Sequence, residues 1–424
     1  MNSNKLPMDN LSHNLVAKYL LNEYKNIFCC ASIKHNLWYE FKNHRWVMID
    51  SAFSLRNLIS NELVIEYTKR QTQLYQLAKE KQGYEKERCF DQAAQICKII
   101  KQLQNTTFKN GVIRECADIT YDPNFLNNLD ENVNLICFEN GVYDLSTGEF
   151  RDGRPNDYIS LCTNYDYVKY NKNDEHSEDI KNIFLNKIQP DKTMRKFLMT
   201  LLSTCLCGSV LEDDLYIFTG SGASGISKLM ELMRYTMGDL FKPMDVRLLM
   251  GKKKSSAIAL ADKKGIRMCT FDEPIATDET KLSFIEIMTG CSTISVRALY
   301  KEPIYFRPQI KPFLMCNHLP VPKEQTTEHM FWPVIKPEDQ DKIKVIHFPS
   351  KFIKASDANM KKNGLTENQF FANVYLSDYL PKWRQMFMGM LIKYFKKYRN
   401  RGLVYPEQAK QHTMQYKKIQ IESN

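Results

Sequence analysis

The sequence predicts an α/β fold, in which a central domain with a parallel sheet is flanked by a mixed α+β N-terminal region and a helical C-terminal segment. Three apolar runs support the sheet: "DLYIFTG", "IRMCTF" and "KPFLMC" each precede small or polar residues, as buried strands that lead into loops do. After residue 365, apolar residues recur at spacings of three and four, which predicts helices, with Gly402 as a natural end.

Changes in composition divide the chain into four expected parts. The segment from about 164 to 179 is polar and poor in apolar residues, as linkers are. The parts that we expect are a helical and α+β N-terminal region (1–125), a β-hairpin segment with a linker (126–175), the central domain (176–350) and a helical C-terminal region (351–424).

Local patterns predict elements within the first 150 residues. In "HNLWYEFKNHRWVMID" apolar and polar residues alternate around a polar turn, which predicts a β-hairpin with Trp38 and Trp46 packed together. The Lys-, Glu- and Gln-rich stretch 64–103 predicts long solvated helices, with a coiled-coil or partner-binding role as the alternative. In "NLICFENGVYDLSTGEF" an Asn-Gly turn at Asn140 separates two strands, and a second turn follows.

The composition is that of a globular protein with more than one domain. The 424 residues are 43% hydrophobic and 25% charged, which argues against disorder. The net charge of +10 fits an anionic partner such as nucleic acid, although proteins that bind none often share it. The 12 cysteines are scattered without metal-ligand spacing, and no apolar run reaches the roughly 20 residues of a membrane span. We therefore expect an intracellular protein with reduced thiols, no zinc site and no membrane.

The stretch "FTGSGASGISKL" has the spacing of a phosphate-binding loop. Gly220, Gly225 and Ser227 fit the pattern G-x-x-x-x-G-K-S, but Ile226 stands in place of the lysine. In such loops backbone N–H groups converge on phosphates at a helix N-terminus, and the hydroxyl holds Mg²⁺. For this stretch alone, a flexible turn of small residues is the alternative. The predicted nucleotide-binding residues are Gly220, Ser221, Gly222, Ala223, Ser224, Gly225, Ile226, Ser227 and Lys228.

Two further strands end in polar side chains suited to nucleotide hydrolysis. Asp272 and Glu273 follow the second apolar run, so that one carboxylate can hold Mg²⁺ together with Ser227 and the other can activate water. Asn317 follows the third run, where an amide can orient that water. Polar groups at the carboxyl ends of parallel strands fit the usual place of ligand sites in open α/β sheets. We therefore predict Asp272, Glu273 and Asn317 as catalytic residues.

Several longer stretches resemble one family. "GDLFKPMDVRLLM", "RMCTFDEP", "TISVRALYKEPIYFRP" and "KPFLMCNHLP" together resemble the poxvirus-type primase-helicases of large cytoplasmic DNA viruses, which are superfamily 3 helicases and include African swine fever virus-like members. "FENGVYDLSTGEF" resembles the domain that precedes the motor in that family. The resemblance covers roughly residues 130–400.

The resemblance implies an AAA+-like P-loop motor that forms a ring, usually a hexamer, and hydrolyses ATP with Mg²⁺ while moving along single-stranded or forked DNA. It also implies replication partners such as a primase or polymerase, and a location in the host cytoplasm. It places a DNA-facing hairpin within "STISVRALYKEPIYFRPQIK", with Arg297 and Lys301 on DNA phosphates. Arg307 and Lys311 add basic side chains to this stretch.

Two departures from the family pattern concern its catalytic cations. Ile226 supplies neither charge nor donor, and removing one such donor typically costs about 10²–10³ in turnover. Lys228 begins the helix on another face and is a poor substitute. The family's arginine that reaches a neighbouring subunit's ATP is not found, because Pro333 follows Trp332 and no arginine lies between residues 307 and 384.

The sequence therefore leaves more than one function open. One is an ATP-dependent superfamily 3 DNA helicase of viral DNA replication. The alternative is a catalytically impaired paralogue that binds DNA or co-assembles with an active subunit, and a decaying gene is a third reading. Because no primase region precedes the motor, we expect a motor module or a shortened paralogue.

Overall fold

The computed structural model of the protein describes most of the chain, and it divides into two compact units. The N-terminal unit comprises residues 1–129 and 154–160, and the parallel-sheet unit comprises residues 130–153 and 161–424. The described residues are 6, 11–209, 211, 214–248, 260, 262–272, 287–289, 292–296, 304–317, 342–354 and 365–421 (side chains to 418). None of the helices among them is long and apolar enough to cross a membrane.

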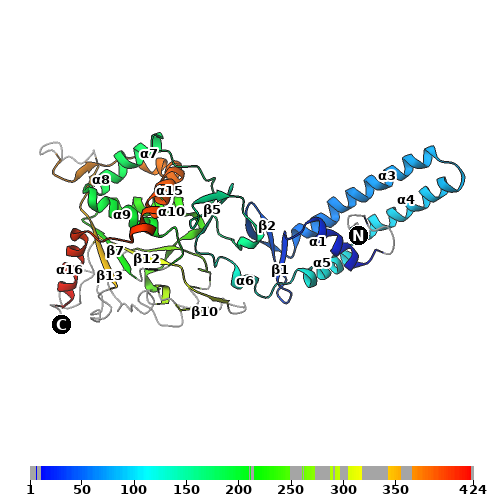
Figure 1. The fold of residues 1–424 in the computed structure, drawn as a ribbon, viewed down its shortest axis with the longest axis horizontal. Helices are drawn as coiled ribbons and strands as arrows, with labels where there is room; N and C mark the ends of the chain where they lie inside the picture. The colour runs from blue at the N-terminus through cyan, green and yellow to red at the C-terminus, as the bar shows by residue number, and fades with distance from the viewer. Residues whose placement is uncertain are drawn as a thin grey trace. The chain divides into compact units, whose positions relative to one another are not determined.

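The N-terminal unit combines a small antiparallel sheet with helices. The sheet contains β1 (Phe28–Ser32), β2 (Leu37–Lys42) and β3 (Arg45–Asp50) in that order. The helices are α1 (His13–Glu23), α2 (Phe53–Asn57), the π-helical segment η1 (Leu58–Leu63), α3 (Val64–Glu80), α4 (Gly83–Gln104), α5 (Thr106–Thr120), α6 (Phe125–Asn128) and the 3-10 helix η2 (Pro155–Asp157). The predicted long helices of residues 64–103 are confirmed as α3 and α4, which run side by side (Figure 1).

The predicted hairpin of β2 and β3 is confirmed, but its two tryptophans do not pack together. Trp46 pairs with Phe41 across the hairpin, whereas Trp38 pairs with Ile49. Since side chains alternate between the faces of a strand, positions 38 and 41 lie on opposite faces. Trp38 is buried against helices of the unit, and Trp46 packs edge-on against Phe125 with ring centroids 5.1 Å apart.

The second unit is built on a parallel sheet with the strand order β13-β7-β12-β9-β8, of which Figure 1 labels β13, β7 and β12. All three apolar runs of the sequence are confirmed as strands of this sheet, with β7 and β12 buried along nearly their whole length. The strands are β7 (Leu215–Gly220), β8 (Phe241–Met244), β9 (Met268–Phe271), β12 (Lys311–Cys316) and β13 (Ile343–Phe348).

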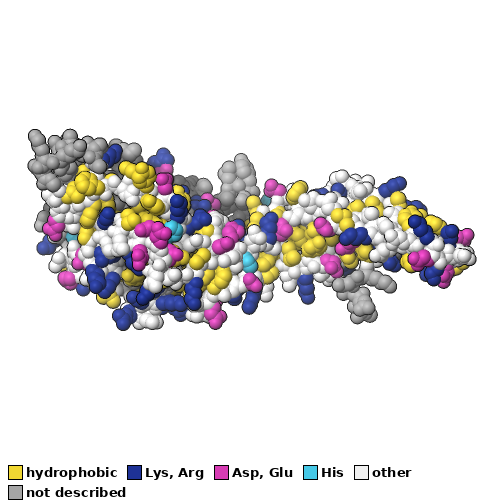
Figure 2. All heavy atoms as spheres, turned by 90° about the horizontal axis from the view of Figure 1, so that it is seen from above, with side chains coloured by type: hydrophobic (Ala, Val, Ile, Leu, Met, Phe, Trp, Pro, Cys, Tyr) yellow, Lys and Arg dark blue, Asp and Glu magenta, His cyan; other side chains and the backbone are white. Residues whose placement is uncertain are grey.

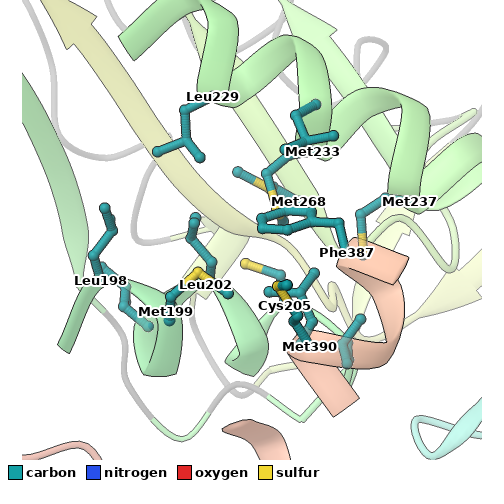
Figure 3. Close-up of a cluster of buried hydrophobic side chains, with 14 of the residues drawn as sticks. Leu198, Met199, Leu202, Cys205, Leu229, Met233, Met237, Met268, Phe387 and Met390 are labelled. Atoms are coloured by element: carbon teal, nitrogen blue, oxygen red, sulfur yellow. The ribbon is translucent and has the colours of Figure 1, made fainter. Parts of the chain in front are cut away.

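Helices cover the parallel sheet. Alternate residues of β7 face two apolar clusters: Tyr216 and Phe218 join one cluster, whereas Leu215 and Ile217 join the other. The first cluster contains side chains of α9 (Lys192–Thr204), α10 (Ile226–Met237) and α15 (Leu376–Arg401), which converge in Figure 3. The second includes β10 (Ile294–Val296), β11 (Ile304–Phe306) and Tyr416 of α16 (Glu407–Ile421).

Smaller elements complete the parallel-sheet unit. The predicted strands of residues 134–150 are confirmed as an antiparallel sheet of β4 (Leu135–Phe138), β5 (Gly141–Asp144) and β6 (Glu149–Arg151). The buried guanidinium of Arg267, beside β9, donates to the carbonyls of Leu135 and Leu206 and so ties this sheet to the core. The remaining elements are α7 (Glu175–Asp179), the π-helical segment η3 (Ile180–Leu185), α8 (Asn186–Ile188), η4 (Gly238–Leu240) and η5 (Val246–Leu248).

The C-terminal helical pattern begins later than predicted. Gln369–Phe371 form β15, which pairs in parallel with β14 (Lys351–Ile353), and α15 starts only at Leu376. Residues 369–371 are extended because they pair with β14, and the helical spacing of apolar residues gave no sign of this strand. The predicted end at Gly402 is confirmed, because this glycine caps α15 with φ of 68°.

A histidine pair between β13 and α16 makes the stability of this unit depend on pH. The rings of His347 and His412 have centroids 5.3 Å apart, and burial lowers the pKa of both below the ordinary 6.5. Because the folded-state pKa of both is lowered, we expect folding stability to fall as the pH drops below about 6.5, where the unfolded chain binds protons more readily.

We predict that urea midpoints for this unit fall between pH 7.5 and 5.5, and that a double substitution of His347→Gln and His412→Gln reduces this fall. His176→Gln, at a half-buried position of α7 away from α16, is the control. An identical pH dependence in the double variant would contradict the prediction.

Candidate nucleotide-binding site

The three predicted motifs meet at one edge of the parallel sheet. Because β12 lies between β7 and β9, the carboxyl ends of these strands are adjacent. In the register, Cys316 pairs with Thr219 and Leu314 pairs with Phe271. Asn317 therefore follows β12 beside the end of β7, and Asp272 follows β9 close by. This is the arrangement predicted from the sequence.

The loop between β7 and α10 needs glycine at two positions. A Cβ at Gly220 would lie 2.7 Å from Cβ of Ser224 and 3.0 Å from the carbonyl oxygen of Phe348. Gly225 caps α10 with φ of 89°, and a Cβ there would lie 2.7 Å from Cγ2 of Ile188. The glycine spacing thus reflects steric limits: a side chain at Gly220 has no space, and at Gly225 both the space and the positive φ disfavour a larger residue.

A pocket of about 480 Å³ opens at this edge of the sheet. Its volume is within the range of roughly 300–1,000 Å³ typical of small-molecule sites. The structure brings residues of all three motifs to its wall: Ala223, Ser224, Gly225, Ile226, Ser227 and Lys228 from the loop, Asp272 after β9, and Asn317 after β12. Gly220 ends β7, and Ser221 and Gly222 continue from it into the loop.

The two residues that bear on the missing loop lysine are both engaged elsewhere. Ile226 is only 6% exposed and belongs to the apolar cluster beneath the loop. The ammonium of Lys228 donates to Glu231 Oε2 at 2.7 Å and to Ser377 Oγ at 2.8 Å. The ammonium of Lys228 is thus held by α10 and the start of α15, in keeping with its prediction as a poor substitute.

The other side of the pocket comes from segments that the sequence did not single out. These residues contribute an apolar surface and two further cations. No motif marks them, because they become neighbours of the loop only through the packing of η3, α8, β14, β15 and α15. They are Ile183, Phe184, Lys187, Phe352, Lys354, Phe371, Ala372, Asn373, Val374, Leu376 and Ser377.

Oxygen donors suited to a hard cation lie on the pocket wall. Ser227 offers a hydroxyl and Asp272 a carboxylate, and both side chains are exposed to the pocket. Mg²⁺ is commonly held by one or two protein oxygens together with water and substrate phosphates, so this pair fits it. Within the described part of the chain, no group of three His, Cys, Asp or Glu side chains forms a denser metal site.

Some predicted site residues fall outside the described residues. These are Glu273, Arg297 and Lys301, as well as the Trp332-Pro333 pair. β10 and β11, on either side of residues 297–303, pair antiparallel as the strands of a hairpin do, and the DNA-facing role of this segment stays a prediction. Arg307, after β11, is exposed.

The prediction that Lys311 adds a basic side chain to the DNA-facing stretch is wrong. It is 1% exposed and its ammonium donates to the carbonyl oxygen of Ser209 at 2.9 Å. The alternation of the sequence could not show this, because Lys311 begins the central strand β12 rather than the hairpin.

Comparison with known proteins places the chain among relatives from large DNA viruses. Residues 17–202 match the family described as "D5 N terminal like". The chain is 57% identical over 415 residues to "Putative helicase L207/L206" of Acanthamoeba polyphaga mimivirus, covering 96% of this chain and 42% of that protein. It is 27% identical to "Putative helicase 121R" of Invertebrate iridescent virus 3, covering 71% of this chain and 32% of that protein.

A more distant relative and a solved structure extend the comparison. "Putative primase C962R" of African swine fever virus (isolate Warthog/Namibia/Wart80/1980) is 23% identical, with 69% of this chain and 30% of the relative covered. The resemblance to the primase-helicase family of large DNA viruses is thereby confirmed, and the chain spans less than half the length of each relative. The apo C-terminal region of NrS-1 is 12% identical with a TM-score of 0.39, covering 60% of this chain and 53% of that one, which is too low to identify the fold.

The loop glycines allow a test of the geometry. We predict that Gly225→Ala destabilises the protein by about 2 kcal/mol or more, because it adds a clash with Ile188 to the strain of a positive φ. Gly222→Ala is the matched control, since Gly222 has φ of 77° but nothing within 4 Å of an added Cβ. Urea unfolding of the two variants measures the difference, and equal losses would show that the Ile188 contact is unimportant.

Proposed function

We propose that this chain, a relative of the D5-type primase-helicases of large DNA viruses, binds ATP with Mg²⁺ in this pocket and is the motor module of a superfamily 3-type DNA helicase in viral DNA replication. The observation that carries the proposal is that one pocket is lined by residues of three motifs, each predicted independently from the sequence. An AAA+-like P-loop motor places its nucleotide at such an edge of a parallel sheet.

Different parts of the pocket would bind different parts of the nucleotide. The loop and the N-terminus of α10 would face the phosphates, and Ser227 with Asp272 would hold Mg²⁺. The apolar side of the pocket, with Phe184 and Phe352, suits a nucleobase. ATP supplies the transferable phosphoryl group, and Mg²⁺ neutralises part of its charge. Asn317 would orient the attacking water, with Glu273 as its base.

The DNA-binding part of the proposal rests on the β10–β11 hairpin and on charge. Arg297 and Lys301 lie in the connection between the two strands, where they would contact the phosphates of single-stranded or forked DNA. Lys and Arg side chains also gather at the lower edge of the parallel-sheet unit in Figure 2. A hexameric ring and replication partners such as a primase or polymerase, at replication sites in the host cytoplasm, complete the proposal.

A second function is favoured by one specific observation. Ile226 places a buried apolar side chain where a catalytic lysine would act. On this second proposal the chain is a catalytically impaired paralogue that binds DNA or co-assembles with an active subunit. The two proposals share the nucleotide pocket and differ in turnover.

For the first proposal we predict measurable MgATP binding and slow, DNA-stimulated hydrolysis that Glu273→Gln abolishes. Asp272→Asn should weaken Mg²⁺-dependent binding, whereas Asp262→Asn, at an exposed carboxylate outside the pocket, should not. Ile226→Lys should raise turnover by about 10²–10³. Equilibrium nucleotide binding and phosphate release measure these effects. Binding without turnover would favour the impaired paralogue, and no MgATP binding at all would contradict both proposals.

For DNA binding we predict that Lys301→Ala weakens the affinity for single-stranded DNA and lowers its salt dependence, because one phosphate contact is lost. Lys196→Ala, at an exposed position of α9, is the control. Fluorescence anisotropy over a range of salt concentrations measures both quantities. An unchanged salt slope in Lys301→Ala would remove this residue from the DNA contact.

A further inference from the structure

The pocket carries two cations that lie outside the phosphate-binding loop. We propose that Lys187 and Lys354 supply to the nucleotide phosphates the positive charge that Ile226 does not. This inference rests on the proposed function and assigns a role to two residues that belong to none of the sequence motifs.

Lys187 is held close to the loop by its neighbours. Ile188, the next residue, approaches Gly225 so closely that a Cβ there would lie 2.7 Å from Cγ2 of Ile188. The carbonyl oxygen of Lys187 accepts a hydrogen bond of 2.5 Å from Ser350 Oγ. The side chain is half-buried and lines the pocket. A lysine can bury its aliphatic stem against apolar neighbours while its ammonium stays in the polar part of the site.

Lys354 approaches the same loop from another segment. Two residues earlier, the backbone N–H of Phe352 donates to the carbonyl oxygen of Ala223 at 2.9 Å. The ring of Phe352 would lie 3.2 Å from a Cβ at Gly225. Because alternate residues of an extended chain share a face, Lys354 lies on the side of Phe352 that meets the loop. Lys354 also lines the pocket, and its side chain is exposed.

The charges around the pocket support an anionic ligand. The cations on its described wall are Lys187, Lys228 and Lys354, and Asp272 is the one carboxylate among the described lining residues. Lys228 is bound to Glu231. By contrast, no carboxylate among the described residues forms an ion pair with Lys187 or Lys354. Two lysines on the wall of one pocket favour an anionic ligand such as a polyphosphate, because opposite charges attract.

Nucleotide affinity tests the assignment directly. We expect Lys187→Met and Lys354→Met each to weaken MgATP binding by about tenfold, the scale of one charged hydrogen bond, and the double variant to weaken it further. Adenosine, which lacks phosphate, should bind all variants alike, and Lys187→Arg should retain most of the affinity. Lys196→Met and Lys351→Met are matched controls, because both side chains are exposed and lie outside the pocket. Isothermal titration calorimetry measures each affinity.

A double-mutant cycle between Ile226 and the two lysines tests whether the lysines replace the missing loop lysine or only attract anions in general. If Lys187 and Lys354 act in place of the loop lysine, their removal should cost less in an Ile226→Lys background than in the natural chain. Equal MgATP affinity of the double variant and the controls would overturn this inference and leave the proposed function standing. Failure of the natural chain to bind MgATP would overturn both. A parallel loss of adenosine binding would show a merely structural role and would also overturn the inference.

Discussion

Burial of both faces of the parallel sheet is the constraint on which the rest of this unit depends. Tyr216 and Phe218 of β7 face one cluster, and Leu215 and Ile217 face the other, so the strand cannot slip by one residue without exchanging the two sets. Truncating one such aromatic side chain costs about 3–5 kcal/mol, whereas an exposed ion pair contributes about 0–1 kcal/mol. Packing therefore fixes the strand ends, and the pocket takes its position from them.

The pocket joins segments that are distant in the sequence. The N–H of Phe352 donates to the carbonyl of Ala223, which attaches β14 to the loop. Lys228 reaches Ser377, which attaches the start of α15 to α10. A ligand between these walls would contact both at once. Its binding energy would then act on how β14 and α15 pack against the loop as well as on the loop itself.

Sequence patterns predicted the strands and the loop because each depends on local features. An apolar run of six residues and glycines at fixed spacing can be recognised without knowing the fold. The predictions were wrong where the pairing of a strand with its neighbour determines which face a side chain occupies or whether it is buried. Trp38 and Trp46 lie on opposite faces because of the register of β2 and β3, and Lys311 is buried because it begins a central strand. Lys187 and Lys354 carry no local signal, since only tertiary packing brings them to the loop.

Ile226 shows that the conformation of the loop does not depend on a positively charged side chain at this position. Isoleucine fits the cluster beneath α10, so the loop keeps its shape without a cation. Gly220 and Gly225 are required by contacts with Phe348 and Ile188 whether or not a nucleotide binds. Their presence is therefore weak evidence for function, because packing alone would retain them. Packing gives no such reason for Lys187 and Lys354, which line the pocket without a carboxylate partner among the described residues, so these lysines indicate an anionic ligand more directly than the glycines do.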